Sequence, residues 1–214
     1  MKGIIIVGGG GHAKVVASIL KKHQDWNPIG YTDPVDRGAI LGLPYLGSDE
    51  AIPEIMSKHS LCLAAIGLGQ LTDFKLREKL IRKILNFGLK IPPIISPDAV
   101  VNEAVNIGHG TIIMDGVIIQ PDVEVGKFSI LNTGSSIDHG CNIGEYTFIA
   151  PGVTLSADVI IGKRVFIGTG ACIIQGIIVS DEITIGSGAV VINDIEEKGT
   201  YAGVPAKIMG LPYE

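Results

Sequence analysis

A six-residue repeat constrains the fold of this 214-residue chain more than any other feature of its sequence. From Ile95 to Val191, every sixth residue is isoleucine, valine or leucine, without exception. The position four residues further on, from Ala99 to Ile195, is always small or β-branched. If about a third of the positions were aliphatic, chance would produce the first series roughly once in 10⁸ trials.

A period of six with two constrained positions is typical of a parallel β-helix. Three hexapeptides form a triangular coil, and the aliphatic side chains point inward and stack from coil to coil. Glycine often follows the aliphatic residue, and we expect it to permit the corner dihedrals that a Cβ would oppose. This explains why glycine is frequent, at 29 residues, and aromatic residues are scarce, at 5%. Residues 95–195 therefore predict about five and a half coils of a left-handed β-helix.

The first 91 residues lack this repeat and alternate between strand and helix patterns. Strands are expected at 2–7, 28–32, 61–66 and 89–91, and helices at 13–22, 49–58 and 72–87. Such alternation predicts a small parallel, Rossmann-like α/β sheet. We therefore expect two domains, an α/β domain over residues 1–91 and a left-handed β-helix with a C-terminal tail over residues 92–214.

A glycine-rich loop, including Gly8, Gly10 and Gly11, follows the first expected strand and leads into a helix N-terminus, where backbone N–H groups can hold an anion. With Asp33, the loop matches the dinucleotide pattern G-x-G-x-x-A followed by an acid. About four strands are too few for a two-halved dinucleotide fold, which disfavours an NAD oxidoreductase. We expect a nucleotide or nucleotide-sugar site, with Asp33 accepting from ribose or base. A simple tight turn, with Asp33 forming the turn before Pro34, is the alternative.

Two of the five histidines, His109 and His139, occupy the same position in their hexapeptides. They are five hexapeptides apart, which is not a multiple of three, so they lie on different edges of the prism. With no third histidine in the repeat, the three-histidine metal site of a γ-type carbonic anhydrase is disfavoured, and no metal site is expected. His139 lies at a polar corner, where an imidazole can act as a general base, whereas His109 is expected to be a solvated corner.

Several segments together carry a family resemblance: the Gly8–His12 loop, Ala65-Ile66-Gly67, Leu131-Asn132-Thr133, Ile137-Asp138-His139 and Ala202-Gly203-Val204-Pro205-Ala206-Lys207. On these the chain resembles the hexapeptide-repeat sugar acyltransferases grouped around bacillosamine N-acetyltransferase and the sialic acid O-acetyltransferases. The resemblance covers nearly the whole chain. It implies a homotrimer that binds acetyl-CoA in a groove between neighbouring β-helices.

The resemblance also implies roles for individual residues. His139 corresponds to the general base, and Asp138, Asn132 or a backbone carbonyl could orient its imidazole. The implied nucleotide-sugar contacts are Gly8, Gly10, Gly11, His12, Asp33 and Gly67. The backbone N–H of Ala157 corresponds to the donor that holds the thioester carbonyl. Cations near the C-terminal end, Lys163, Arg164 and Lys207, are expected to bind the CoA phosphates.

The chain departs from the family pattern at two positions. Gly140 stands where an acidic residue often follows the base, and Phe148 replaces a second histidine nine residues after it. The partner that orients His139 is therefore left open by the sequence.

The predicted function is an acetyl-CoA-dependent acetyltransferase that acts on the amino group of a nucleotide-linked amino sugar in surface glycan synthesis. Sugar O-acetylation, for example of a sialic acid, and non-catalytic nucleotide-sugar binding are the alternatives. The net charge of −5 disfavours nucleic acid as a partner. No apolar run is long enough to span a bilayer, and three cysteines in apolar contexts indicate reduced thiols in a cytoplasmic protein.

Overall fold

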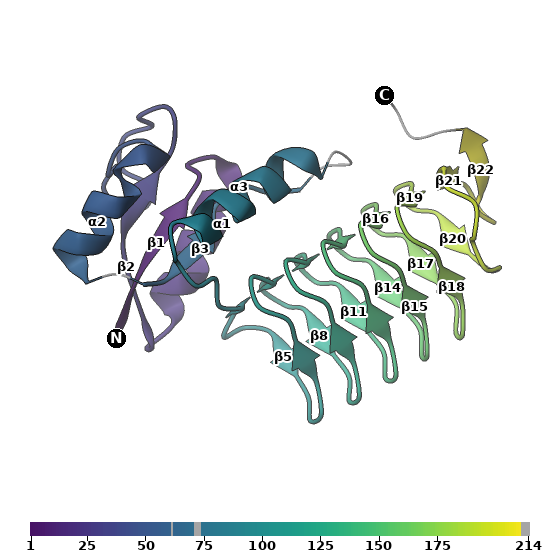
Figure 1. Cartoon of the computed structure of the whole chain (residues 1–214). Helices are drawn as coiled ribbons and strands as arrows, with labels where there is room; N and C mark the ends of the chain where they lie inside the picture. The colour runs from purple at the N-terminus through teal and green to yellow at the C-terminus, as the bar shows by residue number, and fades with distance from the viewer. Residues whose placement is uncertain (61, 71–73, 211–214) are drawn as a thin grey trace. The chain divides into compact units, whose positions relative to one another are not determined.

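The computed structural model describes residues 1–60, 62–70 and 74–210. The chain forms two compact units, unit 1 over Met1–Pro97 and unit 2 over Asp98–Glu214 (Figure 1).

Unit 1 contains a short parallel sheet in the order β2-β1-β3. Its elements are β1 (Lys2–Val7), α1 (Gly11–Lys22), β2 (Trp26–Thr32), the 3-10 helix η1 (Asp49–Ala51), α2 (Ile52–His59), β3 (Ala64–Ile66), α3 (Lys75–Asn86) and β4 (Ile94–Ile95). The predicted small parallel α/β layer is confirmed. The strand expected at 89–91 was wrong, because that part of the described chain makes only a single bridge, between Leu63 and Lys90. Residue 61 of the expected third strand and residues 72–73 of the expected third helix lie outside the described residues, as does residue 71 between them.

The core of unit 1 follows from the spacing of its apolar residues. Residues 4–7 of β1 are all buried, as expected for a parallel strand that is covered on both faces. The buried positions of α3 are Arg77, Ile81 and Ile84. Arg77 lies four residues before Ile81, so the helix period turns an arginine toward the core.

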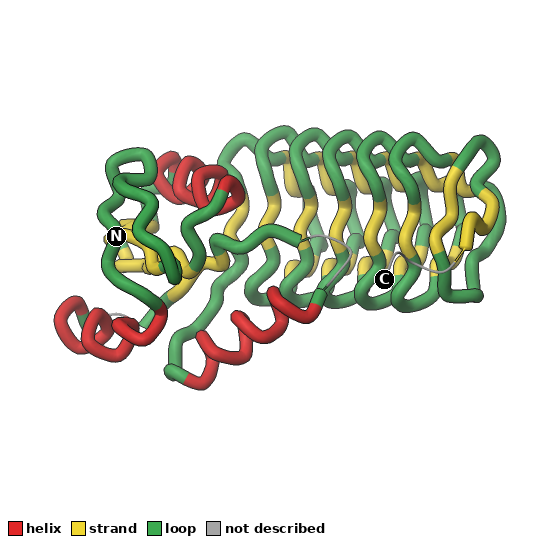
Figure 2. Tube along the Cα trace, turned by 90° about the horizontal axis from the view of Figure 1, so that it is seen from above, coloured by secondary structure: helices red, strands yellow, loops and turns green. Residues whose placement is uncertain are grey.

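Unit 2 is a left-handed parallel β-helix, as the repeat predicts, and its coils stack along one axis (Figure 2). Between Val100 and Val191, paired strands are 18 residues apart, as in the pairing of Ile112, Ile130 and Phe148. The strands are β5 (Val100–Val101), β6 (Asn106–Ile107), β7 (Ile112–Ile113), β8 (Ile118–Ile119), β9 (Glu124–Val125), β10 (Ile130–Leu131), β11 (Ser136–Ile137), β12 (Asn142–Ile143), β13 (Phe148–Ile149), β14 (Thr154–Leu155), β15 (Ile160–Ile161), β16 (Phe166–Ile167), β17 (Cys172–Ile173), β18 (Ile178–Val179), β19 (Thr184–Ile185), β20 (Val190–Val191), β21 (Thr200–Ala202) and β22 (Lys207–Gly210).

The aliphatic repeat residues fill the interior of this prism. From Ile113 to Val191 all of them are buried, each at most 4% exposed. The last two strands, β21 and β22, pair antiparallel and close the C-terminal end. The stacked aliphatic core takes the place of the aromatic packing that the composition lacks.

The glycines after the aliphatic residues have a different cause from the one expected. Gly108 and Gly144 do not have positive φ angles, so the corner-dihedral explanation was wrong for them. Instead, a Cβ on Gly144 would lie 2.7 Å from the backbone nitrogen of Lys163 in the next coil. The left-handed corner lies two residues later in the hexapeptide, for example at Gly134 with φ +67° and Phe128 with φ +61°.

Candidate active site and substrate-binding residues

His139 lies at an exposed corner between β11 and β12. Its backbone N–H donates to Oδ1 of Asp138 at 2.7 Å, and its carbonyl oxygen accepts from the N–H of Asp158 at 2.9 Å. Among the described residues nothing hydrogen-bonds to the His139 ring. The corner therefore presents an imidazole with both nitrogens open to a substrate.

The predicted orienting residues serve the local turns. Oδ1 of Asn132 accepts from the backbone N–H of Thr133 at 2.8 Å, just as Asp138 accepts from its own following residue. Asn132 and Asp138 are one hexapeptide apart and so lie on adjacent edges of the prism. Each side chain caps its own corner.

Ala157 follows His139 by 18 residues and lies on the same edge, one coil further on. Its carbonyl oxygen accepts from the N–H of Gly176 at 2.9 Å. Within the described chain, its own N–H donates to no group. A free backbone donor beside an exposed imidazole can hold the oxygen of a carbonyl that becomes negatively charged.

Cys141 lies beneath the His139 corner and is buried. Its Sγ hydrogen-bonds to the carbonyl oxygen of Ser156 at 3.1 Å. Burial, together with the charges of Asp138 and Asp158, raises the pKa of the thiol to about 11. Cys141 is therefore a neutral core thiol near neutral pH and is unsuited to nucleophilic attack.

The two departures from the family pattern have structural explanations. Phe148 stacks on Phe166 with ring centroids 5.1 Å apart, so this position contributes packing. Gly140 has φ +69°, in the left-handed region that glycine adopts readily. His109, the corner expected to be solvated, is exposed and packs edge-on against Phe128 at 5.0 Å.

In unit 1 the structure brings two of the predicted glycines together. Gly8 has φ +106°, and a Cβ there would lie 2.9 Å from the carbonyl carbon of Gly67. Gly10 and Gly11 have open space where a side chain would be, at the beginning of α1. Gly10 is the N-cap residue of this 12-residue helix, and no side chain caps the N–H groups of the first turn. These N–H groups are therefore open to an anion.

Asp33 is buried, and its carboxylate accepts a hydrogen bond from the glycine-rich loop after β1. Its Oδ2 accepts from the N–H of Gly9 at 2.8 Å, and its Oδ1 accepts from the N–H of Val35 and from Nε of Arg37. The turn-forming interpretation therefore describes its contacts in this structure. Contact with a nucleoside stays a prediction.

His12 is a half-buried, neutral imidazole in the first turn of α1. Burial, reinforced by the charge of Arg77, lowers its pKa from 6.5 to about 3. Its Nε2 is buried, and no hydrogen-bond partner for it lies among the described residues. Arg77, whose Nη1 donates to the carbonyl oxygen of Leu68, was missed by the sequence analysis. The available signal was an arginine four residues before Ile81 on the apolar face of a helix.

Of the cations expected to bind CoA, two are already paired. Nζ of Lys163 lies 3.1 Å from Glu145, and Arg164 lies 4.0 Å from Glu182 and over the ring of Tyr146. Lys207, on β22, is exposed and makes no ion pair within the described chain. A free cation on the terminal hairpin is the most accessible of the three to a phosphate.

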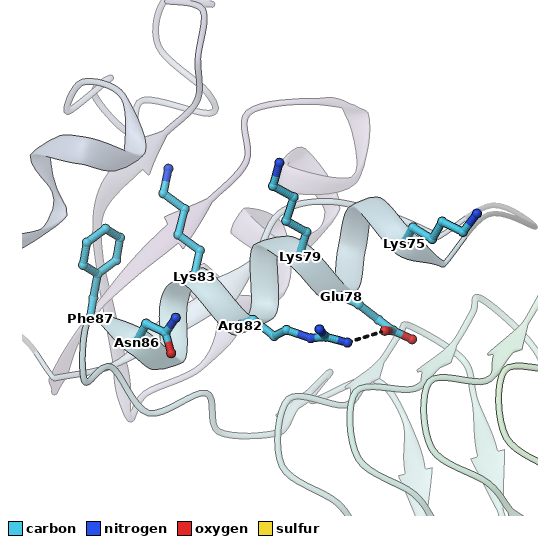
Figure 3. Close-up of a pocket in the computed structure, with 7 residues that line it drawn as sticks. All are labelled: Lys75, Glu78, Lys79, Arg82, Lys83, Asn86 and Phe87. Atoms are coloured by element: carbon cyan, nitrogen blue, oxygen red, sulfur yellow. Dashed lines mark hydrogen bonds and ion pairs between the residues drawn. The ribbon is translucent and has the colours of Figure 1, made fainter.

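A pocket of about 500 Å³ lies along α3, apart from the predicted site residues (Figure 3). In Figure 3, Arg82 extends along the helix to Glu78, and their ion pair is 3.2 Å long. Lys83 pairs with Glu50 at 2.9 Å. The pocket is lined by Lys75, Glu78, Lys79, Arg82, Lys83, Asn86 and Phe87.

The described ranges contain neither a metal centre nor a helix that could span a membrane. No group of three or more histidine, cysteine or acidic side chains there is arranged to hold a metal ion. No helix among those residues has both the length and the apolar character that crossing a membrane requires.

Residues 3–84 match the model of the PglD N-terminal domain. No curated protein matches the sequence. PerB from Caulobacter crescentus, solved with CoA and GDP-perosamine, is 36% identical over 98% of both chains, with a TM-score of 0.88. A histidine-to-alanine variant of GDP-perosamine N-acetyltransferase from the same organism, in complex with the same two molecules, is 35% identical over 98% of both chains, with a TM-score of 0.89.

The acetyltransferase domain of PglB from Neisseria gonorrhoeae is 30% identical, covering 98% of this chain and 100% of that one, with a TM-score of 0.88. It has also been solved in complex with acetyl coenzyme A. These proteins share the full length of the present chain at identities of 30% or more. The chain belongs to the PglD-like family of hexapeptide-repeat sugar acetyltransferases.

Proposed function

We propose that this protein transfers the acetyl group of acetyl-CoA to the amino group of a nucleotide-linked amino sugar. The observation that carries the proposal is the full-length likeness to PerB, which is solved with CoA and GDP-perosamine. A nucleotide and CoA together in one relative require one site for each, and this chain offers an anion-binding loop in unit 1 and an imidazole corner in unit 2.

In the proposed reaction, the sugar amine attacks the carbonyl carbon of the thioester directly. His139 takes a proton from the attacking nitrogen, and the backbone N–H of Ala157 stabilises the oxyanion. The carbon–sulfur bond then breaks, the acetyl group stays on nitrogen as an amide, and the proton can pass from His139 to the departing thiolate. No covalent acyl-enzyme is needed, in keeping with the neutral thiol of Cys141.

For unit 1 we propose nucleotide recognition by the loop of Gly8, Gly10 and Gly11 and the adjoining His12, Asp33 and Gly67. The open first turn of α1 suits a pyrophosphate, because its N–H groups and helix dipole favour negative charge. The buried Arg77 adds positive charge beside His12. CoA phosphates would bind Lys207 and the neighbouring cations Lys163 and Arg164.

We further propose a homotrimer, in the cytoplasm, that serves surface polysaccharide synthesis. Support for the trimer comes from aliphatic side chains that face outward on unit 2, including Ile160 and Ile178, each more than 40% exposed. Support for the location comes from the two cosubstrates, because nucleotide sugars and acetyl-CoA are both cytoplasmic metabolites.

The test is an acetyl-transfer assay with acetyl-CoA and a panel of nucleotide-linked amino sugars that includes UDP and GDP forms. Release of the CoA thiol, with a product heavier by one acetyl group that resists hydroxylamine, is the expected result. Hydroxylamine removes esters and leaves amides, so a labile product would identify a sugar O-acetyltransferase. Ligand-dependent thermal stabilisation without any transfer would instead identify a nucleotide-sugar-binding protein.

A further inference from the structure

A general base works only if its imidazole presents a lone pair to the attacking amine. The proton of the neutral ring must then sit on the other nitrogen, and a carboxylate that accepts from that N–H selects this tautomer. At the His139 corner, Asp138 and Asn132 each use an oxygen to cap a backbone N–H. Another group must therefore accept the hydrogen bond from the imidazole N–H. The role assigned to that group below rests on the proposed function, in which His139 is the general base.

Asp158 comes to the His139 corner from the next coil. Its backbone N–H donates to the carbonyl oxygen of His139 at 2.9 Å. Asp158 and Gly140 are 18 residues apart, so they stack on one edge of the prism, and both have left-handed φ angles, +59° and +69°. Asp158 is therefore held next to the corner by the main chain.

The side chain of Asp158 leans back over Gly140. A Cβ on Gly140 would lie 3.4 Å from Cγ of Asp158, and closer still to its Oδ1. The missing side chain at position 140 is thus the space that the Asp158 carboxylate occupies. Burial is the main cause of the raised pKa of Cys141, the residue after Gly140, and the charge of Asp158 adds to it.

The Asp158 carboxylate has no other task within the described chain. It is exposed and makes no hydrogen bond or ion pair there, in contrast to Asp138, whose Oδ1 is engaged. Both of its oxygens can accept from an imidazole N–H. We infer that Asp158 is the positioning residue for His139: it accepts the hydrogen bond from one ring nitrogen and leaves the lone pair of the other for the sugar amine.

The first test replaces Asp158 by asparagine, which keeps the shape and also tolerates a left-handed φ. An amide can present either oxygen or nitrogen to the ring, so it no longer selects one tautomer. We expect kcat to fall roughly ten- to a hundredfold with both KM values within about twofold of wild type. Asp122→Asn is the matched control, because Asp122 is exposed, has φ +61° and lies on the same edge one coil before Gly140.

A spectroscopic measurement tests the role of Asp158 independently of whether the protein acetylates an amino sugar. The ¹⁵N shifts of the His139 ring, assigned by comparison with His139→Ala, report the tautomer at a pH where the ring is neutral. With CoA bound, one tautomer should dominate in wild type and in Asp122→Asn, and a mixture should appear in Asp158→Asn. If wild type acetylates no amino sugar, the proposed function fails, whereas the ring shifts still decide the role of Asp158.

A swap of the two edge residues provides the strongest test. Asp158→Gly should lower kcat as Asp158→Asn does. The kcat of Gly140→Asp/Asp158→Gly should be at least about tenfold higher than that of Asp158→Gly, because the carboxylate returns to the same space. Gly140→Asp alone should not gain activity, since its Cβ would meet Asp158. Wild-type kcat and an unchanged tautomer in both Asp158 variants would overturn the inference, as would a swap no better than Asp158→Gly.

Discussion

His12 and His139 carry the same side chain in opposite environments. His12 is held neutral by burial and by the charge of Arg77. His139 is exposed at a corner, with a free backbone N–H at Ala157 on the same edge of the next coil. The first environment suits a packed, uncharged role beside an anion site, and the second suits proton transfer.

Replacing His139 by alanine should lower kcat by roughly 10²–10⁴, the usual contribution of a general base. Binding of CoA should persist, because the substitution removes neither the backbone N–H of Ala157 nor any of the proposed phosphate-binding cations. Initial-rate kinetics and calorimetric titration with CoA measure the two effects. His109→Ala is the control, since His109 packs on Phe128 and faces a different edge. Equal rates for both variants would mean that another group accepts the proton.

The lowered pKa of His12 predicts a pH-dependent stability. Unfolded His12 takes up a proton near pH 6.5, but folded His12 does so only near pH 3. Between these values the unfolded state binds more protons, so stability is lost as the pH falls from about 6.5. The loss should reach on the order of 2–3 kcal/mol by about pH 4.5.

Thermal unfolding of wild type and His12→Gln across this range measures the effect. The Tm of wild type should fall more steeply with decreasing pH than that of His12→Gln, because glutamine does not titrate. His59→Gln, at an exposed helix end, should keep the wild-type slope. Parallel slopes in wild type and His12→Gln would show that His12 is as easily protonated in the folded protein as in the unfolded one.

At the scale of the element, glycine occurs at two hexapeptide positions for two different reasons. Gly144 faces the backbone of the next coil, whereas Gly134 has a left-handed φ and open space around it. The first restraint is a steric contact between coils 18 residues apart, and the second is a local dihedral preference. Only a side chain at the first position, where the coils are in contact, should destabilise the fold strongly.

Gly144→Ala should therefore destabilise unit 2 by several kcal/mol, because its Cβ would overlap backbone that the coil stack cannot move. Gly134→Ala should cost only about 1 kcal/mol, the penalty for a left-handed alanine. Urea unfolding monitored by circular dichroism gives both values. Similar losses for the two variants would contradict the steric explanation.

The terminal hairpin of β21 and β22 presents Lys207 without an ion-pair partner among the described residues. Lys207→Gln should raise the KM for acetyl-CoA several-fold and leave the KM for the sugar nucleotide unchanged, because a charge-assisted phosphate contact contributes on the order of 1–2 kcal/mol. Lys127→Gln is the matched control, since Lys127 already pairs with Glu145 at 3.0 Å. An unchanged acetyl-CoA KM would place the CoA phosphates elsewhere.

At the scale of the whole molecule, unit 2 has apolar side chains on its outer surface. Val100 pairs with Ile118, and Ile160 pairs with Ile178, on two different sheets, and each side chain is at least 40% exposed. A closed cyclic assembly of a β-helix can cover such a face in every copy. Neighbouring copies would then meet along a side of the prism, where the resemblance puts the acetyl-CoA groove.

Light scattering should accordingly give a mass of about three times 22.5 kDa. Ile118→Lys and Ile160→Lys each place a lysine on one of the two apolar faces. The substitution on the face that the trimer covers should lower that mass, because burying an unpaired ammonium is costly. The variant on the uncovered face serves as the control. A wild-type mass of one chain at micromolar concentration would contradict the trimer and the groove between subunits.

Much of the fold was predictable from the sequence. The β-helix follows from the hexapeptide series, because each coil repeats the same inward position and stacks on a copy of itself. The α/β unit follows from alternating patterns, and the loop from Gly8 to His12 from its place between a strand and a helix. The choice of His139 over His109 used its polar neighbours and the family resemblance, and its catalytic role stays a prediction.

Only the tertiary structure decided which residues meet across long separations in the chain. Arg77 lies beside His12, 65 positions away, and Asp158 fills the space above Gly140, 18 positions away. The sequence pattern specifies which side of a strand or helix a residue faces, but the direction in which an exposed side chain leans depends on the space its neighbours leave. In the sequence, Gly140 stands where an acidic residue often follows the base. In the structure, the carboxylate of Asp158 from the next coil occupies the space beside Gly140.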